Sequence, residues 1–266
     1  MHARVPCLVV LWGVVWAVGG CAVRPALSDP APAAHPLFAR AEQAYLRGER
    51  EQALELFRAY CLGFGHGEQG ATARYWEGVI LLELGQPELA EASFAIAIRE
   101  SAQLRLRAQA ITGLGDCAFA RGDYEQAARQ YRRAIDLGAP GARNDYALYR
   151  LGVAQQRAGD WGSGRNCYEL LLRDYPHSPL AGLARRRLAF PLPGFHVEVA
   201  EFAEQTQAQL FSVRLRERGH PVRRLELPGR SPRWLVWAGP FATYAEAAAA
   251  AEALGGSLGR RLEVIP

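Results

Sequence analysis

Apolar positions follow two different patterns along the chain, and the change between them falls near residue 190. From residue 37 to 188, small and large apolar residues repeat with helical spacing, which predicts amphipathic helices. From residue 195 onward, short runs alternate apolar and polar residues and are separated by Ala-rich segments. Such alternation is typical of half-buried strands. The sequence therefore predicts a helical part followed by a small part that contains both strands and helices.

Within the helical part, one pattern of small and aromatic residues recurs at intervals of 37 residues. A glycine ends the first helix of each unit, a small residue lies seven positions before it and another five after, and an aromatic residue follows nine positions after. We call each recurring position a column. The glycine column is Gly48, Gly85, Gly122 and Gly159, and the small residues before it are Ala41, Gly78, Gly115 and Gly152. The small residues after it are Ala53, Ala90, Ala127 and Gly164, and the aromatic column is Phe57, Phe94, Tyr131 and Tyr168. The pattern predicts four stacked helical hairpins. We expect the small residues of the two helices to meet, and the aromatic residues to fill the space between successive hairpins.

The third unit shows the pattern most clearly, in Leu114-Gly115, Gly122-Asp123-Tyr124-Glu-Gln-Ala127 and Tyr131-Arg-Arg-Ala134. It resembles the tetratricopeptide repeat. That family has a period of about 34 residues, so each unit here carries about three extra residues. We expect them between hairpins, as in the segment from Gly63 to Gly70.

The resemblance implies a groove, lined by the first helices of the hairpins, that binds a peptide or protein segment. The candidate groove residues are Tyr45, Tyr75, Phe119 and Tyr149. A second interpretation, that these aromatic residues pack within the array, is equally open. A last helix is expected from about Ser178 to Leu188 as a cap, and its three consecutive arginines, residues 185–187, suit either a solvated helix end or an anionic lipid or polymer.

The last seventy or so residues contain one strand pattern twice, in Phe195-His-Val-Glu-Val-Ala-Glu-Phe202 and Trp234-Leu-Val-Trp-Ala-Gly-Pro-Phe241. The expected strands are residues 196–199, 222–227, 234–238 and 261–265, and the expected helices are residues 204–218 and 244–254. Two helices on one face of a four-stranded antiparallel sheet would bury the apolar sides of all six elements. Alternation directs Val197, Val199, Trp234, Val236 and Ala238 toward the helices.

This repeated pattern is similar to the SPOR domain, and the match covers residues 195–266. The Gly239-Pro240-Phe241 element is its most specific part, whereas Glu198 stands where that family usually has Gln and Ala200 where it usually has Gly. The resemblance implies binding to peptidoglycan, particularly to glycan strands stripped of stem peptides, often at division sites. The candidate glycan-binding residues, on the face expected to be open or at the strand ends, are His196, Glu198, Phe202, Leu235, Trp237 and Phe241. Packing of Leu235 and Trp237 against the array or a partner is the alternative.

The first twenty residues have the features of a targeting segment. Arg4 precedes an apolar run from Cys7 to Val18, and Val18-Gly19-Gly20-Cys21 resembles the lipobox of bacterial lipoproteins. The resemblance implies cleavage before Cys21 and lipidation of that residue, and an ordinary secretory signal is the alternative. Residues 21–36 are Pro-rich and predict an extended tether. Because Ala22 follows the cysteine, the outer membrane is favoured over the inner membrane.

Composition and motifs favour a protein without catalytic residues, metal or cofactor. The formal charge of +4 is too small to indicate nucleic acid, and every basic residue counted in it is Arg. Cys61, Cys117 and Cys167 are widely spaced and are expected to be buried thiols, although one pair could form a disulfide. The segment from Gly65 to Gly70 matches a dinucleotide-binding pattern, but it does not follow a predicted strand. The segment from Gly255 to Gly259 matches a hydrolase pattern, but no acid and histidine follow it in the required order.

The expected architecture is an all-α array of helical hairpins, an α–α solenoid, followed by a small α+β domain with the order βαββαβ. Its expected parts are residues 1–20 as signal peptide, 21–36 as lipidated tether, 37–190 as repeats with a capping helix, and 195–266 as the SPOR-like domain. The expected function is non-enzymatic: a periplasm-facing lipoprotein that binds peptidoglycan and recruits a protein partner. The alternative is an assembly scaffold whose last domain does not bind glycan. An exported chain argues against RNA as the ligand of the sheet.

Overall fold

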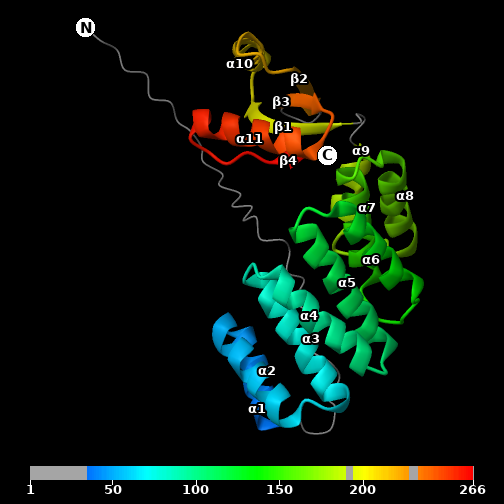
Figure 1. Cartoon of the computed structure of the whole chain (residues 1–266). Helices are drawn as coiled ribbons and strands as arrows, with labels where there is room; N and C mark the ends of the chain where they lie inside the picture. The colour runs from blue at the N-terminus through cyan, green and yellow to red at the C-terminus, as the bar shows by residue number, and fades with distance from the viewer. Residues whose placement is uncertain (1–34, 190–193, 228–232, 266) are drawn as a thin grey trace. The chain divides into compact units, whose positions relative to one another are not determined.

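The computed structural model of the chain describes residues 35–189, 194–227 and 233–265 (Figure 1). The expected signal peptide, the expected lipidation site Cys21 and nearly all of the Pro-rich tether lie outside these residues. The described chain contains a helical array followed by a domain with a four-stranded sheet. The predicted fold class, a helical-hairpin array followed by an α+β domain, is confirmed.

The array consists of four antiparallel helical hairpins and one further helix within the described residues. The hairpins are formed by α1 with α2, α3 with α4, α5 with α6, and α7 with α8, and each hairpin packs on the next. The helices are α1 (Pro36–Leu46), α2 (Arg50–Phe64), α3 (Gly67–Glu83), α4 (Pro87–Glu100), α5 (Leu104–Ala120), α6 (Tyr124–Asp136), α7 (Asn144–Arg157), α8 (Trp161–Asp174) and α9 (Ala181–Ala189). The last of these is the predicted capping helix.

The turn inside each hairpin has the same geometry, because the same glycine position ends the first helix. Gly48, Gly85, Gly122 and Gly159 have φ between 73° and 89°, which is a strained conformation for residues with a Cβ atom. In each turn the N–H of the residue after the glycine donates to a carbonyl five residues earlier, over 2.8 to 3.0 Å. This is the Schellman motif. The side chains of Asp123 and Asp160 also cap the following helices, whereas Glu49 and Gln86 form no side-chain cap.

The aromatic column packs directly against the glycine column. The Phe94 ring of α4 lies between Gly78 in its own hairpin and Gly113 in the next, and a Cβ atom added to either would come within 2.8 Å of the ring. Tyr131 contacts Gly115 in the same way. The aromatic residues therefore fill the space between hairpins, as predicted. In the fourth hairpin the small residues of the two helices also meet, as predicted, since a Cβ atom on Gly164 would lie 2.8 Å from the carbonyl oxygen of Gly152.

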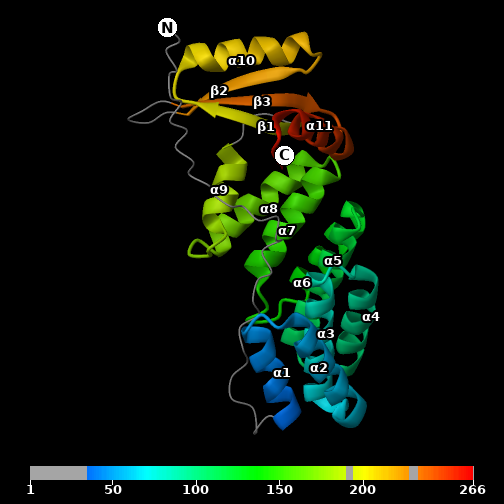
Figure 2. The same ribbon diagram turned by 90° about the vertical axis from the view of Figure 1, so that its left-hand side faces the viewer.

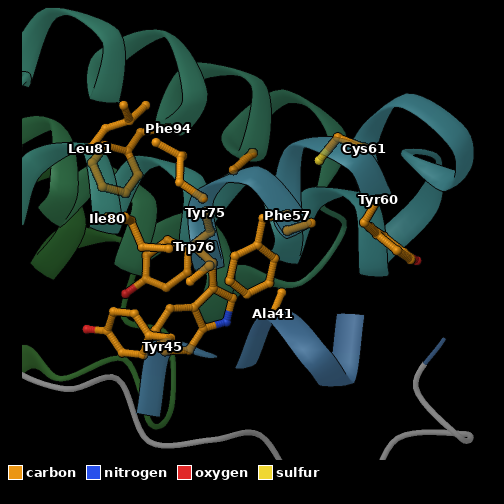
Figure 3. Packing of buried hydrophobic residues seen from close by; sticks show 14 of the residues in the cluster. Ala41, Tyr45, Phe57, Tyr60, Cys61, Tyr75, Trp76, Ile80, Leu81 and Phe94 are labelled. Atoms are coloured by element: carbon orange, nitrogen blue, oxygen red, sulfur yellow. The ribbon is translucent and has the colours of Figure 1, made fainter. Parts of the chain in front are cut away.

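The first two hairpins enclose the largest apolar cluster of the array. Figure 3 shows Tyr45, Phe57, Tyr75, Trp76 and Phe94 packed together in it. The rings of Phe57 and Trp76 are stacked, with centroids 6.2 Å apart. Because large rings bury much apolar surface each, this cluster supplies a major part of the array's stability.

The extra residues of the longer repeat lie between hairpins in the third unit, where residues 137–143 join α6 to α7, but in the first unit most of them are helical. Only Gly65 and His66 separate α2 from α3, and the rest of the segment from Gly63 to Gly70 is helical. The two helices meet closely there: a Cβ atom on Gly70 would lie 2.3 Å from the carbonyl oxygen of Gly65. The glycines thus allow helices to approach, and much of the added length in this unit extends the helices.

The C-terminal domain has the predicted order βαββαβ. Its elements are β1 (Phe195–Phe202), α10 (Gln205–Glu217), β2 (Val222–Leu227), β3 (Arg233–Phe241), α11 (Tyr244–Leu258) and β4 (Val264–Ile265). All strand pairs are antiparallel, and the strand order is β2-β3-β1-β4. Figure 2 shows α10 running along the sheet formed by β2, β3 and β1. Both β2 and β4 are therefore edge strands, and β2 is much the longer.

Both helices of this domain pack on one face of the sheet. Val197, Val199, Val236 and Ala238 form a core with α10 and α11, so the predicted inward-facing positions are confirmed. Trp234 is half-buried against the same core. Gly239 is required for a close approach of two strands, since an added Cβ atom would lie 2.7 Å from the carbonyl oxygen of Phe195.

The three cysteines of the described chain are free thiols. Cys61, Cys117 and Cys167 are all buried in the array, as expected. Burial raises the pKa of the Cys61 and Cys167 thiols to about 11 and that of Cys117 to about 12. At neutral pH they are therefore protonated side chains that pack as small apolar groups.

The packing of rings on glycines predicts a specific sensitivity to a single methyl group. Gly115→Ala would place a Cβ atom 2.6 Å from the ring of Tyr131, which is fully buried and cannot move away. We expect a loss of about 1–3 kcal/mol in the free energy of unfolding, measured by urea denaturation. The control is Gly182→Ala in α9, where no atom lies within 4 Å of the added methyl group. This control should stabilise the protein by roughly 0.5–1 kcal/mol; equal effects of the two substitutions would contradict the packing described.

Candidate functional site

The sheet face opposite the helices carries four of the predicted glycan-binding residues, and three of them are buried. The exposed fractions of His196, Leu235 and Trp237 are 0%, 7% and 2%. Trp237 is paired with Glu198 on one neighbouring strand and Arg223 on the other, and its ring centroid is 5.8 Å from that of His196. The prediction that Trp237 is exposed is therefore wrong. Side chains from adjacent strands cover the indole, so it cannot stack on a sugar ring without their displacement.

Glu198 and Trp237 interact with each other on this face. The indole of Trp237 donates a hydrogen bond to the half-buried Glu198 carboxylate. Burial raises the pKa of Glu198, and the nearby Glu201 adds to the increase, while the indole hydrogen bond opposes it. Glu198 is thus a carboxylate whose environment disfavours its ionised form, and it already interacts with Trp237 within the protein.

His196 is a packing residue in this structure. Its Nδ1 atom donates to the carbonyl oxygen of Gly194 over 3.0 Å. Burial lowers the pKa of His196 and the charge of Arg223 lowers it further, although the Gly194 contact favours the charged form. A neutral, buried imidazole of this kind does not contact a ligand directly.

The two phenylalanines at the strand ends belong to the helix side of the sheet. Phe202 is half-buried, and its ring centroid is 5.3 Å from that of Phe211 in α10. Phe241 also packs against the core between the sheet and the helices. Of the six predicted glycan-binding residues, only Glu198, Phe202 and Phe241 retain moderate exposure.

A hollow of about 450 Å³ lies along the edge strand β2, where our sequence analysis placed no site. Its lining consists of basic, aromatic and apolar residues from α10, β2 and β3. They are Gln205, Arg216, Val222, Arg223, Arg224, Leu225, Trp234 and Trp237. The signal that could have located it is the Arg223-Arg224 pair, which falls within a strand that the sequence predicted correctly.

The guanidinium groups of this hollow differ in how they are engaged. Arg216 donates to the carbonyl oxygen of Val222 over 3.2 Å, and Arg224 donates to Gln209 over 3.4 Å. Arg223 is exposed and, within the described residues, forms no hydrogen bond or ion pair. It is therefore the guanidinium best placed to bind a ligand carboxylate in a bidentate manner. Beside it, the half-buried indole of Trp234 offers apolar surface, whereas Trp237 is buried.

The candidate groove residues of the array divide into two kinds. Tyr45 and Tyr75 are core residues, 2% and 9% exposed, and Figure 3 shows both within the apolar cluster. The packing interpretation is correct for these two, because neighbouring hairpins cover them. Tyr149 is half-buried with its ring centroid 5.8 Å from that of Tyr168. Phe119 is half-buried beneath a guanidinium group.

That guanidinium belongs to Arg150, at the centre of a polar cluster that joins the third and fourth hairpins. Its Nε atom lies 3.0 Å from Asp116, which also accepts from Tyr131 over 2.6 Å and from Tyr146 over 3.2 Å. The Arg150 guanidinium carbon lies 3.9 Å from the centroid of the Phe119 ring. Burial raises the pKa of both tyrosines, so they remain neutral hydrogen-bond donors. The cluster is internally satisfied, which suits a structural role.

Membrane-spanning helices and clusters of metal-ligating side chains are both absent from the described part of the chain. None of its helices combines the length and apolarity that crossing a bilayer requires. Likewise, no group of His, Cys, Asp and Glu among the described residues is arranged to hold a metal ion.

The Asp116 cluster predicts a large effect of removing its cation. Arg150→Met would leave the Asp116 carboxylate, only 16% exposed, without its charged partner. We expect a loss of about 3 kcal/mol in the free energy of unfolding, measured by urea denaturation. The control is Arg99→Met, which breaks an exposed pair with Glu100 and should cost less than about 1 kcal/mol. A small effect of Arg150→Met would show that the pair does not hold the two hairpins together.

The environment of Glu198 predicts a pH-dependent gain in stability on neutralisation. Its folded-state pKa is raised, so ionisation destabilises the fold at pH values above that pKa and has no effect below the unfolded-state pKa near 4.5. Glu198→Gln should therefore raise the urea midpoint at pH 7, and the difference from the parent should disappear as the pH falls below about 4.5. Glu217→Gln, at an exposed position in α10, is the control and should change the midpoint little at either pH. A Glu198→Gln effect that is the same at pH 7 and pH 4 would refute this account.

Comparison with known proteins agrees with these two architectures. The family model described as tetratricopeptide repeat matches residues 38–105, 77–142 and 112–179, which together cover more than half of the chain. The SPOR domain model matches residues 191–260. A search of curated proteins found no match.

Two similar solved structures are those of MamA and of YrrB, a TPR protein with an unusual peptide-binding site. MamA is 19% identical with a TM-score of 0.45, and the match covers 55% of this chain and 82% of MamA. YrrB is 18% identical with a TM-score of 0.46, and the match covers 56% of this chain and 73% of YrrB. On the family matches, the chain belongs to the tetratricopeptide repeat family and carries a SPOR domain at its C-terminal end.

Proposed function

We propose that this chain is a non-enzymatic protein of the bacterial cell envelope that binds peptidoglycan and recruits a protein partner. Tetratricopeptide repeats and SPOR domains are binding modules, which supports the absence of a catalytic role. The SPOR domain suggests peptidoglycan as one ligand, and the repeats suggest a protein or peptide as the other. The observation that carries the proposal is the hollow along β2, where Trp and Arg side chains meet.

The chemistry of this hollow favours glycan strands from which the stem peptides have been removed. Hydrolysis of the amide that attaches a stem peptide leaves a carboxylate on the sugar. Arg223 provides an exposed guanidinium to bind such a carboxylate, and the half-buried indole of Trp234 can contact the apolar face of a sugar ring. The ligand site in this proposal therefore lies at the edge of the sheet, with Glu198 at its margin.

The proposal includes a place in the cell. Cleavage before Cys21 and lipidation of that residue would anchor the chain, with the Pro-rich segment as a spacer and the outer membrane as the favoured location. The folded parts would then face the periplasm. Among the processes that produce stripped glycan strands, cell division is the one in which we place this protein.

A second candidate function is a scaffold for envelope protein assembly whose sheet domain does not bind glycan. It is favoured by the burial of His196, Leu235 and Trp237, which removes the residues expected to contact sugar rings. In this case only the array would bind a partner, and the basic edge of the sheet would serve solubility.

Co-sedimentation with purified sacculi distinguishes the two functions. We expect the protein to pellet with sacculi, and more strongly after treatment with an amidase that removes stem peptides. Arg223→Ala should weaken binding to treated sacculi roughly tenfold, because a charge-assisted hydrogen bond is lost. Arg214→Ala removes an equally exposed arginine from α10 and should bind like the parent.

Two results would decide against the glycan site as placed here. If the parent protein does not pellet with either kind of sacculi, the scaffold function is correct. If the parent pellets but Arg223→Ala binds equally well, the protein binds the wall through another surface.

A further inference from the structure

A second hollow, of about 550 Å³, lies in the array between α6 and α7. Three guanidinium groups of α6, those of Arg129, Arg132 and Arg133, line it together with the carboxylate of Asp136. Because these residues are spaced by three or four positions, they form one face of α6. Leu137, and Leu151 of α7, supply the apolar part of the lining.

The arginines of this hollow carry uncompensated positive charge. Arg129 has a distant, exposed ion pair with Glu125, at 3.8 Å. Arg132 and Arg133 are exposed, and within the described chain they form no hydrogen bond or ion pair. By contrast, Arg121 in the same hairpin pairs with Glu91 at 2.7 Å. Two guanidinium groups without an ion-pair partner in the described chain therefore line the hollow.

Arg132 also extends toward the next hairpin. Burial raises the pKa of the Cys167 thiol in α8, and the charge of Arg132 opposes that increase. Arg132 thus influences α8 as well as the hollow.

The hollow lies on a different face of α7 from the Asp116 cluster. Leu151 and Gln155, four residues apart, line the hollow. Tyr146 and Arg150, also four residues apart, point to Asp116 and Phe119. A ligand in the hollow would therefore not contact the Asp116 cluster, which is formed mainly by the first helices of the hairpins.

We propose that this hollow binds an acidic peptide segment of a partner protein, with an apolar side chain on Ala128 and Leu137 and carboxylates on Arg132 and Arg133. The volume lies in the range of ligand-binding pockets, and its apolar lining suits a side chain. Guanidinium groups on successive turns match carboxylates that are themselves separated along a peptide. Asp136 at the rim disfavours a compact, highly charged anion such as phosphate. The site is independent of the sheet domain and of peptidoglycan binding.

The test uses the complete protein and a fluorescein-labelled peptide of the sequence Glu-Glu-Leu-Glu-Glu, measured by fluorescence anisotropy at low salt. The double variant Arg132→Ala/Arg133→Ala should raise the Kd at least tenfold. The matched control, Arg214→Ala/Arg218→Ala, removes two exposed arginines of the C-terminal domain and should leave the Kd unchanged. Asp136→Asn should lower the Kd severalfold, because it removes a charge that repels the peptide carboxylates and leaves the arginine donors in place.

Three results would overturn the proposal. If both double variants weaken binding equally, the peptide responds only to net charge. If a peptide with Gln in place of Glu binds equally well, the carboxylates are not recognised. If inorganic phosphate displaces the peptide at micromolar concentration, the hollow is a site for small anions and not for a peptide.

Discussion

The contact between a glycine and an aromatic ring sets the spacing of the helical array. Phe94 lies where Cβ atoms of Gly78 and Gly113 would otherwise be, so one ring fixes the distance to two first helices. Tyr131 on Gly115 repeats the contact in the next hairpin. The contact depends in turn on the positive φ of the hairpin glycines, because an identical turn brings the same two positions together each time. Packing and turn geometry are therefore one constraint, which explains why both columns share the period of 37 residues.

The polar cluster of the array follows from this packing. Where the aromatic column changes from Phe94 to Tyr131, a hydroxyl enters a dry interior and requires a partner. Asp116, next to Gly115, accepts it at 2.6 Å, and Arg150 then balances the carboxylate. In the fourth hairpin, the Tyr168 hydroxyl instead donates to the neutral Gln156 at 2.8 Å, and that position needs no cation. The ion pair of Asp116 and Arg150, which joins the third hairpin to the fourth, is thus a consequence of the Tyr131 hydroxyl group.

The sequence predicted those features that depend on local pattern. The hairpin turns, the ring column, the order of strands and helices, and the inward-facing Val197 and Val236 were all predicted correctly, because period and alternation specify them directly. The extra residues of the first unit were expected between hairpins but are mostly helical, because glycines such as Gly70 also permit helices to approach closely. The exposure of Trp237 was wrong for another reason. The exposure of Trp237 depends on which residues of β1 and β2 lie beside it, and the register between β1 and β3 is irregular.

The burial of Trp237 changes which part of the sheet can recognise a ligand. A face that is filled by its own side chains offers few groups to a sugar, and the glycan site that we propose therefore lies at an edge. The two edges differ, because β4 has two residues whereas β2 has six. An unpaired edge attracts other strands unless charges protect it. Arg223 and Arg224 provide such charges on β2, and a guanidinium that repels a foreign strand remains available to a carboxylate. The protection of the edge and the binding of an acidic sugar are therefore compatible uses of the same residues.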